Sequence, residues 1–406
     1  MDEVIVVGAG IGGLTLGIAL HQAGIPCRIF ESAAEPRAVG INLLPHATRE
    51  LAALGLEPAL ERVAIKTKDI AYFNRFGQLI YREPLGRAAG SSYPQFSIHR
   101  GDLQLLLRNA FIEHAGSDRL VTNSRCVEVA QDEHGVTVTF SDSVGGSDRH
   151  TVRGGLAIAC DGIHSAVRKQ FFPDQAEPRY SGVNMWRGVT RWKPILSGAS
   201  MIRAGWLSQG KLIIYPTRAA DADGLQLISW VAEIETPTYR KRDWDSKGAM
   251  VDFLGAFLNW HFDWLDVPEF LRAADSVLEF PMVDYDPLPR WSFGRVTLLG
   301  DAAHPMVPRG SNGTGQAILD ARALTTALRE TPDPVAALAA YEAKRRDITD
   351  RGVLANRTNP PDAILREVFQ RTHDQPFADI DAVISRAELK ALSDGYKQFA
   401  GFSNEA

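Results

Sequence analysis

Three glycines near the N-terminus have the spacing of a phosphate-binding turn. Gly8, Gly10 and Gly13 form G-x-G-x-x-G between an apolar run at 4–7 and a helix-like stretch at 14–23. The first glycine permits a tight turn, the second lets a pyrophosphate approach the backbone, and the third allows close packing of helix on strand. The N-terminus of the following helix offers free N–H groups and a positive dipole to phosphates. The pattern therefore predicts dinucleotide binding.

A carboxylate stands where such a turn would need one. Glu31 ends the second expected strand, 27–30, and an acidic residue at this place accepts hydrogen bonds from an adenosine ribose. Residues 4–31 thus form one complete βαβ unit. The bland alternative is a glycine-rich turn between core elements, and the motif alone leaves NAD(P) and FAD both open.

A second group of residues, far along the chain, favours FAD. Asp301 follows an expected buried strand at 295–299, where its carboxylate can reach a ribityl hydroxyl. Residues 308–313 then open a helix whose N-terminus can stabilise negative charge on a reduced flavin ring. A third segment, Asp161-Gly162, follows the apolar run 156–159, although a simple helix-capping turn is its alternative.

The remaining pattern indicates the elements that position these motifs. We expect an alternating hairpin over 65–85, a helix over 102–114, and a strand pair at 127–129 and 136–140. A helical tract is expected from about 315 to 356, and an amphipathic helical tail packs on the body over 360–406.

Residues 175–285 differ in character from the rest of the chain. Seven of the eight tryptophans fall here. Segments 211–215 and 225–231 alternate like strands of an antiparallel sheet, with one helix expected near 249–258. The sequence therefore predicts an α/β dinucleotide-type layer split by an inserted sheet domain.

Composition excludes several classes of protein. Lys and Arg number 44 against 49 Asp and Glu, so a formal net charge of −5 argues against a nucleic-acid partner. No apolar run is long enough for a membrane span. Cys27, Cys126 and Cys160 form no C-x-x-C pair, which predicts no metal site and fits a reducing, cytoplasmic location.

Taken together, the glycine fingerprint, Asp161-Gly162 and Gly300-Asp301 resemble the single-component (group A) flavoprotein aromatic hydroxylases, such as para-hydroxybenzoate, salicylate and kynurenine hydroxylases. The resemblance covers nearly the whole chain. Segments 93–104, 185–189 and 281–289 are most similar to the phenazine hydroxylase branch.

The resemblance implies a fold and an activity. The fold is a Rossmann-like, para-hydroxybenzoate hydroxylase-like FAD-binding domain interleaved with an antiparallel-sheet substrate domain, followed by C-terminal helices. The domain boundaries are 1–70, 100–174 and 286–350 for the FAD-binding domain, 71–99 and 175–285 for the substrate domain, and 351–406 for the helical tail. The activity is hydroxylation of an aromatic or heteroaromatic small molecule through a flavin hydroperoxide, with NAD(P)H as a transient co-substrate and O2.

The resemblance also implies residue roles around FAD. The ADP half is held by Gly8, Gly10, Ile11, Gly12, Gly13, Glu31 and Ser32, with the backbone of Val127 at the adenine. Arg37 and Arg100 lie against the phosphates and flavin edge, Asp301 binds the ribityl chain, and Gly310, Ser311 and Asn312 face the isoalloxazine. Asp161, His164 and Arg168 take part in handling FAD and the nicotinamide cofactor.

A substrate pocket is expected between the flavin ring and the inserted sheet, lined by Trp186, Tyr215, Trp230 and Pro305. Should a substrate need deprotonation, the candidates are Tyr215, Tyr72 and His304, although a structural role for His304 is favoured. Arg187 or Arg309 either pairs with an acidic substrate or forms a surface salt bridge. The run 344–346 reads as a solvated helix face.

Other functions stay open at this point. A same-fold epoxidase or drug-inactivating hydroxylase would differ only in its pocket, and a non-catalytic flavin-binding sensor would keep the same FAD motifs. A halogenase is disfavoured because the chain has no Trp-x-Trp-x-Ile-Pro stretch. The expected assembly is a monomer or a homodimer.

Overall fold

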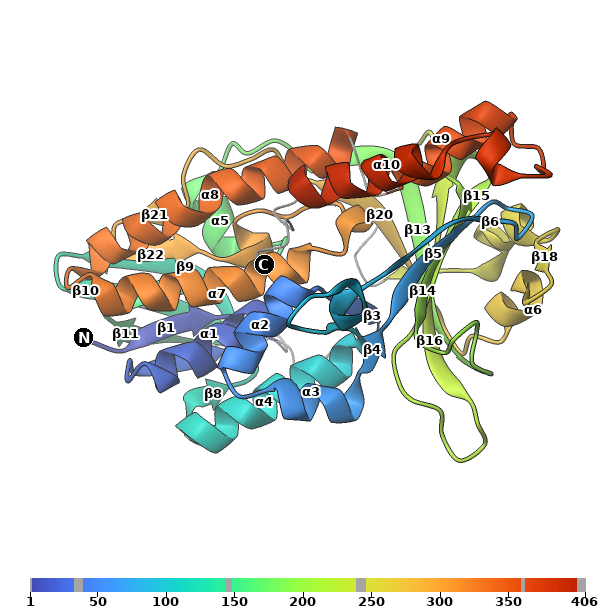
Figure 1. Cartoon of the computed structure of the whole chain (residues 1–406). Helices are drawn as coiled ribbons and strands as arrows, with labels where there is room; N and C mark the ends of the chain where they lie inside the picture. Colours follow the sequence, from blue (N-terminus) through green and yellow to red (C-terminus); the bar gives the residue numbers. More distant parts are fainter. Residues whose placement is uncertain (1, 33–38, 143–147, 239–245, 359–361, 400–406) are drawn as a thin grey trace.

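The computed structural model describes residues 2–32, 39–142, 148–238, 246–358 and 362–399. Two bodies lie side by side in Figure 1. One is a sheet covered by long helices, and the other is a large sheet that stands across its end. Two further helices, drawn in red, cross the top of both.

A six-stranded sheet forms the centre of the helix-covered body. Its inner strands are apolar and buried on both faces, which is typical of parallel sheets covered by helices. Only the edge strand β21 is antiparallel to its neighbour. The order is β21 (Ser292–Phe293), β22 (Val296–Leu298), β12 (Leu156–Ala159), β1 (Val4–Val7), β2 (Cys27–Phe30) and β8 (Leu120–Val121).

The parallel register brings three distant chain segments together. Val7 pairs with Ala159, which pairs in turn with Leu298. The loops that follow β1, β12 and β22 therefore leave the same edge of the sheet next to one another. This confirms the interleaved α/β fold class expected from the sequence, because strands from residues 4–7, 156–159 and 296–298 pair in one sheet.

Helices cover this sheet and extend toward the second body. Helix α1 lies against α4 and α7, and α7 lies against α8 and α2. The helices are α1 (Ile11–Gln22), α2 (Pro45–Ala53), α3 (Glu57–Val63), α4 (Arg100–Ala115), α5 (Ala166–Phe171), α6 (Val267–Arg272), α7 (Gly313–Glu330), α8 (Pro334–Thr358), α9 (Ala363–Thr372) and α10 (Arg386–Phe399).

Three small sheets complete the connections. One contains β11 (Arg149–Gly154), β10 (Gly135–Asp142) and β9 (Ser124–Asp132), and another contains β3 (Gly40–Leu43), β7 (Gln95–His99) and β4 (Ile65–Thr67). A two-stranded sheet joins β18 (His261–Phe262) to β19 (Leu265–Asp266).

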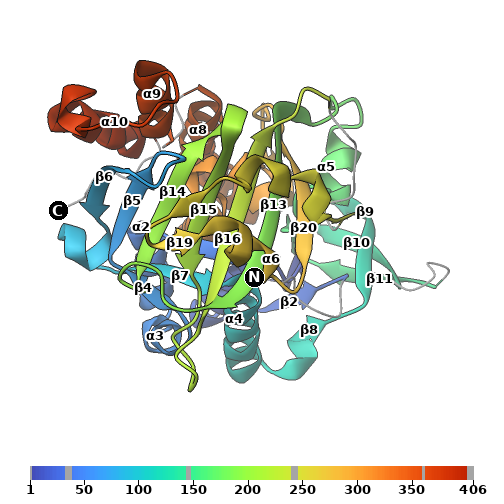
Figure 2. The ribbon, with the colours of Figure 1, turned by 90° about the vertical axis from the view of Figure 1, so that its right-hand side faces the viewer.

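The second body is an eight-stranded sheet, seen face-on in Figure 2. Its pairs are antiparallel except β14 with β5, which is parallel. The order is β17 (Ser246–Lys247), β20 (Val277–Asp284), β13 (Arg179–Trp192), β16 (Gln226–Glu235), β15 (Gly210–Pro216), β14 (Ser200–Trp206), β5 (Asp69–Phe73) and β6 (Leu79–Pro84).

This sheet buries a different core on each face, because side chains alternate along a strand. One face packs Trp186 and Trp230 against Phe253, with ring centroids 5.4 and 5.7 Å apart. The other face carries Met185 and Tyr215, and α9 packs on it. The face with Met185 and Tyr215 is called the inner face below, since it looks toward the helix-covered body.

Sheet membership bears on the domain division, which stays a prediction. Within the segment 71–99, β6 joins the eight-stranded sheet, whereas β7 pairs with β3 and β4. Strand β5 begins at Asp69, two residues before that predicted segment.

Two sequence predictions about helices are wrong. The helix expected near 249–258 is a pair of short 3₁₀ turns, Met250–Asp252 and Leu254–Phe257. The tract expected from 315 to 356 is broken between α7 and α8. Pro332 and Pro334 lie at the break, where proline lacks the N–H needed for an unbroken helix.

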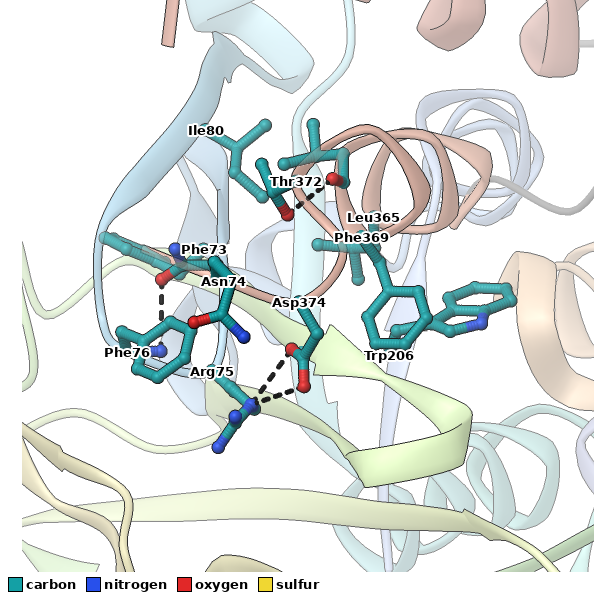
Figure 3. Close-up of a pocket in the computed structure, with 13 residues that line it drawn as sticks. Phe73, Asn74, Arg75, Phe76, Ile80, Trp206, Leu365, Phe369, Thr372 and Asp374 are labelled. Atoms are coloured by element: carbon teal, nitrogen blue, oxygen red, sulfur yellow. Dashed lines mark hydrogen bonds and ion pairs between the residues drawn. The ribbon is translucent and has the colours of Figure 1, made fainter. Parts of the chain in front are cut away.

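The C-terminal helices are fastened to the β5–β6 hairpin. Arg75 donates from Nε to both carboxylate oxygens of Asp374, at 2.9 and 2.8 Å, beside the hollow between α9 and the hairpin shown in Figure 3. Farther along, the Ser393 hydroxyl donates to Glu83 at 2.5 Å. In the described part of the chain, no helix combines the length and apolar character that a membrane span requires.

The tight packing around Trp230, on the face of the large sheet opposite the inner face, predicts the effect of one added methyl group. A Cβ on Gly188 would overlap the ring of Trp230, which lies opposite it on the neighbouring strand. We expect Gly188→Ala to lower the free energy of unfolding by about 1–3 kcal/mol in urea denaturation. Gly255→Ala is the control, because a Cβ there meets nothing within 4 Å. Equal stability of the two variants would contradict this packing.

Candidate functional site

The first loop of the site follows β1, and the three glycines of its G-x-G-x-x-G motif are required for different reasons. Gly8 has φ +104°, and a Cβ there would come within 2.5 Å of the Cys160 carbonyl oxygen. A Cβ on Gly13 would overlap the carbonyl of Gly8. A Cβ on Gly10 would meet nothing within 4 Å. The chain itself therefore requires Gly8 and Gly13, whereas the bare backbone at Gly10 suits close approach by a bound phosphate.

The carboxylate predicted for the ribose stands beside this loop. Glu31 Oε2 accepts a hydrogen bond from the Ala9 N–H at 2.6 Å, and the Ser32 hydroxyl lies 3.2 Å from Oε1. Val127 is skipped in the pairing of β9 with β10, so it is the extra residue of a β-bulge, and it is 37% exposed. The ribose and adenine candidates are thus accessible.

The loops after β12 and β22 are tied together by one buried arginine. Arg168 donates from Nη1 to the carbonyl oxygens of Asp301 and Ala302, at 3.1 and 3.2 Å, and from Nη2 to that of Ile163. Burial lowers the pKa of its guanidinium, opposed by nearby negative groups. Arg168 therefore holds the backbone of the Asp301 loop and leaves the Asp301 side chain exposed.

Asp161 accepts a hydrogen bond from the first residue of α5, the helix whose N-cap is Ser165. Its Oδ2 accepts from the Ala166 N–H at 2.9 Å, while Oδ1 is buried with no hydrogen-bond partner among the described residues. Burial raises the pKa of this carboxyl. The capping turn considered from the sequence is present, and one oxygen stays available to a ligand. His164, also implied by the resemblance, is exposed.

A buried carboxylate that sequence reasoning missed supports the Asp301 loop from below. Asp320 Oδ2 accepts from the Gly300 N–H at 3.1 Å and lies 2.6 Å from His304 Nε2, and Oδ1 lies 2.7 Å from Arg345 Nε. Burial raises the pKa of Asp320, but the charges of His304 and Arg345 outweigh it and hold the pKa low.

This network corrects one prediction and bears on another. Arg345 is buried and also donates to Gln316, so the run 344–346 is not simply a solvated face. His304 is buried against Asp320 with its ring 5.2 Å from Trp291, which is the structural role favoured from the sequence. Gln316 Nε2 in turn donates to Asn312 Oδ1 at 3.1 Å, so the network reaches the predicted flavin loop.

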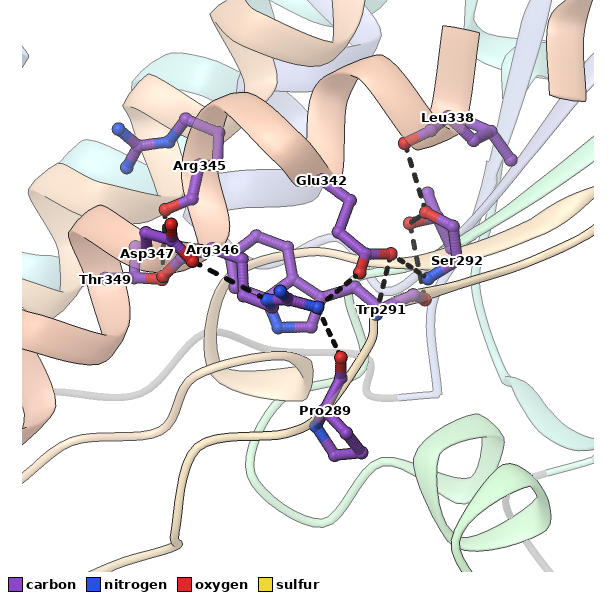
Figure 4. Close-up of polar contacts among 10 residues, drawn as sticks. Pro289, Trp291, Ser292, Leu338, Glu342, Arg345, Arg346, Asp347 and Thr349 are labelled. Atoms are coloured by element: carbon purple, nitrogen blue, oxygen red, sulfur yellow. Dashed lines mark hydrogen bonds and ion pairs between the residues drawn. The ribbon is translucent and has the colours of Figure 1, made fainter. Parts of the chain in front are cut away.

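Helix α8 also holds the start of β21, the edge strand that pairs with β22, as Figure 4 shows. The Glu342 carboxylate accepts from the N–H groups of Trp291 and Ser292 at 2.9 and 2.7 Å. Arg346 donates to Glu342 and to the carbonyl of Pro289. The hairpin of β21 and β22, which leads into Gly300-Asp301, is therefore held at its start by α8.

A histidine of α2 that was not predicted from the sequence, His46, lies against the N-terminus of α7. His46 hydrogen-bonds Asn312, and burial lowers its pKa to about 4. A Cβ on Gly315 would come within 2.9 Å of His46 Nε2. A neutral imidazole therefore lies against Asn312 at pH 7. An isolated histidine carries no spacing signal, so no sequence pattern predicts its position here.

The flavin-loop residues gather at the same place. Gly310, Ser311 and Asn312 lead into α7, and Ser311 adopts φ +53°. A Cβ on Gly313 would lie 3.8 Å from Asp301 Oδ1, so the N-terminus of α7 is beside the Asp301 carboxylate. The Arg100 N–H donates to the Val39 carbonyl at 2.6 Å. Arg37 lies outside the described residues.

The predicted pocket residues divide between the two faces of the large sheet. A Cβ on Gly40 would lie 2.8 Å from the Tyr215 ring and 2.5 Å from Ser229 Oγ, so Tyr215 meets the helix-covered body. Trp186 and Trp230 lie on the opposite face, and their prediction as pocket residues is wrong. Tryptophan content revealed burial but could not reveal which face each side chain occupies.

Tyr72, a candidate proton acceptor, and Pro305, a candidate pocket residue, are both buried. Burial raises the pKa of the Tyr72 hydroxyl well above its usual range, which makes Tyr72 a poor proton acceptor. Pro305 is buried in the loop after the Asp301 turn.

A compact group of four buried charges closes the inner face near α9. Lys211 bridges Glu233 at 2.5 Å and Asp362, and Arg203 also pairs with Asp362. Burial raises the pKa of Asp362, but Lys211 and Arg203 outweigh it and lower the value to about 2. Arg203 Nη2 further donates to the Arg309 carbonyl at 3.3 Å, which joins this group to the flavin loop.

Comparisons with known proteins agree with this geometry. The family model described as "FAD binding domain" matches residues 1–355. The chain is 42% identical over 390 residues to phenazine 1,6-dicarboxylic acid hydroxylase of Lysobacter antibioticus, covering 94% of this chain and 95% of that one. It is 33% identical over 355 residues to 3-amino-4-hydroxybenzoate 2-monooxygenase of Streptomyces platensis, with 84% of each covered.

A solved structure shares the whole architecture. The crystal structure of Klebsiella pneumoniae HpxO complexed with FAD and uric acid superposes with a TM-score of 0.76 at 27% identity, covering 98% of this chain and 95% of that one.

The space at Gly10 gives a test that separates cofactor binding from folding. Because an added Cβ meets nothing in the chain, Gly10→Ala should leave the thermal stability of the FAD-free protein unchanged. It should weaken FAD binding about tenfold or more, ~1.4 kcal/mol, because the methyl group takes the space of the pyrophosphate. Fluorescence titration with FAD measures this, with Gly352→Ala in α8 as the control. Unchanged FAD affinity would remove Gly10 from the site.

A half-buried carboxyl on α8 predicts a pH dependence of stability. Burial raises the pKa of Asp350 to about 6, against the opposing charges of Arg346 and His304. A raised folded-state pKa gives stability that is complete below the unfolded value near 4 and is lost as the pH rises through 6. After allowance for solvent screening, the loss is on the order of 1 kcal/mol. Urea denaturation at pH 4.5–8 should show a slope that Asp350→Asn removes; parallel curves for the two proteins would contradict it.

Proposed function

The chain belongs to the FAD binding domain family and is an FAD-dependent, NAD(P)H-consuming aromatic monooxygenase, and we propose that its substrate is a fused-ring heteroaromatic acid. Two relatives are named for a phenazine dicarboxylic acid and an aminohydroxybenzoate as substrates. Both names support an aromatic carboxylic acid as the substrate of this enzyme. The higher identity to the phenazine hydroxylase favours the fused-ring class.

The observation that carries the proposal is the meeting of three strand ends at one edge. Gly8, Asp161 and Asp301 follow neighbouring parallel strands, and the bare backbone of Gly10 and the exposed Asp301 carboxylate fit a flavin dinucleotide. Open α/β sheets bind their ligands at the carboxyl ends of the strands. The inner face of the large sheet then offers apolar cover for an aromatic ring.

We assign the contacts to FAD from this arrangement. Glu31 would take the adenosine ribose, Gly10 the pyrophosphate and Asp301 the ribityl chain. Gly310, Ser311 and Asn312 would lie along the flavin ring. When bound, FAD supplies the activation of O2 that no amino-acid side chain provides.

The protein's own residues bind and orient the cofactor and the substrate, and they exclude water from the site. The N-terminus of α7 offers N–H groups and a positive dipole where negative charge on the ring would lie. The inner-face side chains Met185, Ile213 and Val231 keep water from the reacting atoms. The Tyr215 hydroxyl is the candidate group to hold a proton of the substrate.

The test is a substrate screen on the purified flavoprotein. Phenazine carboxylates should stimulate oxidation of NADH or NADPH and give hydroxylated product in proportion to the reductant consumed. An aromatic compound that stimulates no oxidation while still binding would favour the sensor function instead. Olefin substrates converted to epoxides would favour the epoxidase.

The exposed carboxylate of Asp301 supplies a second check. Asp301→Ala removes a solvent-facing side chain, so the FAD-free protein should melt within about 1–2 °C of the wild type. The affinity for FAD should fall about tenfold or more, because a charged hydrogen-bond acceptor to a hydroxyl is lost. Equilibrium dialysis against FAD measures the effect, with Asp174→Ala, at an exposed residue after α5, as the control. Full FAD affinity in the variant would end this assignment.

We also propose a cytoplasmic enzyme that is a monomer or homodimer. Cys27, Cys126 and Cys160 are all free, which suits a reducing compartment. Light scattering of the FAD-loaded protein would establish the assembly.

A further inference from the structure

Among the described residues, four buried or half-buried cations lie on the inner face of the large sheet or in the flavin loop beside it, and the chain neutralises their charges unequally. Lys211 and Arg203 are balanced by Glu233 and Asp362 in the buried group described above. Arg187 and Arg309 form no ion pair with any carboxylate among the described residues. This pattern raises the question of what balances them.

Arg187 is placed at the seam between the two bodies. It lies on β13, two residues beyond Met185, and therefore on the inner face with Met185 and Tyr215. Its Nη2 donates to the Gly40 carbonyl at 2.6 Å. Gly40 in turn lies against the Tyr215 ring. Arg187 is thus next to the candidate pocket, rather than in the surface salt bridge considered from the sequence.

The hydrogen bonding of Arg187 is incomplete. Its Nε is buried and has no acceptor in the described part of the chain. A buried guanidinium N–H without a partner is costly, and guanidinium forks match carboxylates in a bidentate geometry. The Gly40 carbonyl is neutral, so it satisfies a donor without balancing the charge.

We propose that Arg187 binds a carboxylate of the aromatic substrate through Nε and a second N–H of the guanidinium, while Nη2 stays on Gly40. This rests on the proposed function and specifies how the acid group of the substrate is recognised. The contact to Gly40 fixes the guanidinium, so the substrate pays little entropy to align it. The ring of the substrate then extends along the inner face toward Tyr215.

Arg309 is the competing candidate and is weaker on its contacts. Its Nε also has no hydrogen-bond partner in the described parts of the chain, but its charge helps to lower the pKa of Asp362. Asp362 therefore already compensates part of the Arg309 charge. Arg187, by contrast, forms no ion pair with a carboxylate among the described residues.

The experiment compares two probes on the FAD-loaded enzyme: phenazine-1-carboxylate and phenazine. Binding of each is followed by the change in the flavin absorption spectrum, which needs no turnover. In Arg187→Gln, the dissociation constant of the carboxylate should rise about 30-fold or more, and that of phenazine should change less than about twofold. Arg187→Lys, which keeps the charge without the fork, should show an intermediate loss.

Matched variants keep the result specific. Arg191→Gln lies on the same strand, but Arg191 is exposed and pairs with Asp221 and Asp223, so both probes should bind it normally. Thermal melting and FAD content of each variant establish that it is folded. Arg309→Gln tests the competing cation under the same conditions.

Several outcomes would overturn the assignment. Unchanged carboxylate affinity in Arg187→Gln, or a selective loss in Arg309→Gln instead, would place the acid group elsewhere. Equal weakening of both probes would show that Arg187 only supports the Gly40 backbone. A wild-type enzyme that binds phenazine but gains nothing from the carboxylate contradicts the Arg187 inference alone. One that binds neither probe contradicts the proposed substrate class and the inference with it.

Discussion

The buried carboxylate of Asp320 is the interaction on which the site's geometry depends. One oxygen holds the Gly300 N–H and His304, and the other holds Arg345. Ionised groups without water need such compensation, and removal of one partner leaves an uncompensated charge that costs several kcal/mol. The loop that presents Asp301 therefore rests on a network whose members constrain one another. The exposed Asp301 side chain can serve a ligand because its backbone is held from beneath.

Arg168 gives the same support from the side. It bonds carbonyls of both the Ile163 and the Asp301 loops, so two segments far apart in sequence keep a fixed separation. Neither Arg168 nor Asp320 needs to touch a cofactor for this role. The structure thus divides the work: buried charges fix the backbone, and exposed backbone and side chains face the ligand. This division explains why the positioning residues outnumber the residues with an evident chemical task.

The strands and loops of the site could be predicted from the sequence, but the buried charged residues that hold those loops in place could not. Short apolar runs ended by Gly8, Asp161 and Asp301 are strong signals, because only buried parallel strands combine such runs with turn residues at their ends. Asp320 is inside a helix, where a lone aspartate resembles any residue on a polar face. Its burial depends on His304 and Arg345, which no local pattern connects to it.

The large sheet shows the same limit in a different form. Alternation predicted its strands, yet a shift of one residue exchanges its faces, so Trp186 and Tyr215 could not be assigned to opposite sides from the sequence. Contacts settle the matter: Trp186 stacks on Phe253, and Tyr215 meets Gly40.

The same alternation puts several charged residues of the sheet on the inner face, among them Arg187, Arg203, Lys211 and Glu233. A charge on a buried face needs a partner of opposite sign, either from the chain or from a ligand. The chain supplies one for Lys211 and Arg203 through α9 and β16, which also fastens the C-terminal helices to the flavin loop. Arg187 receives a neutral carbonyl instead. The pairing that completes the fold at one end of this face therefore leaves, at the other end, the positive charge that an acidic substrate requires.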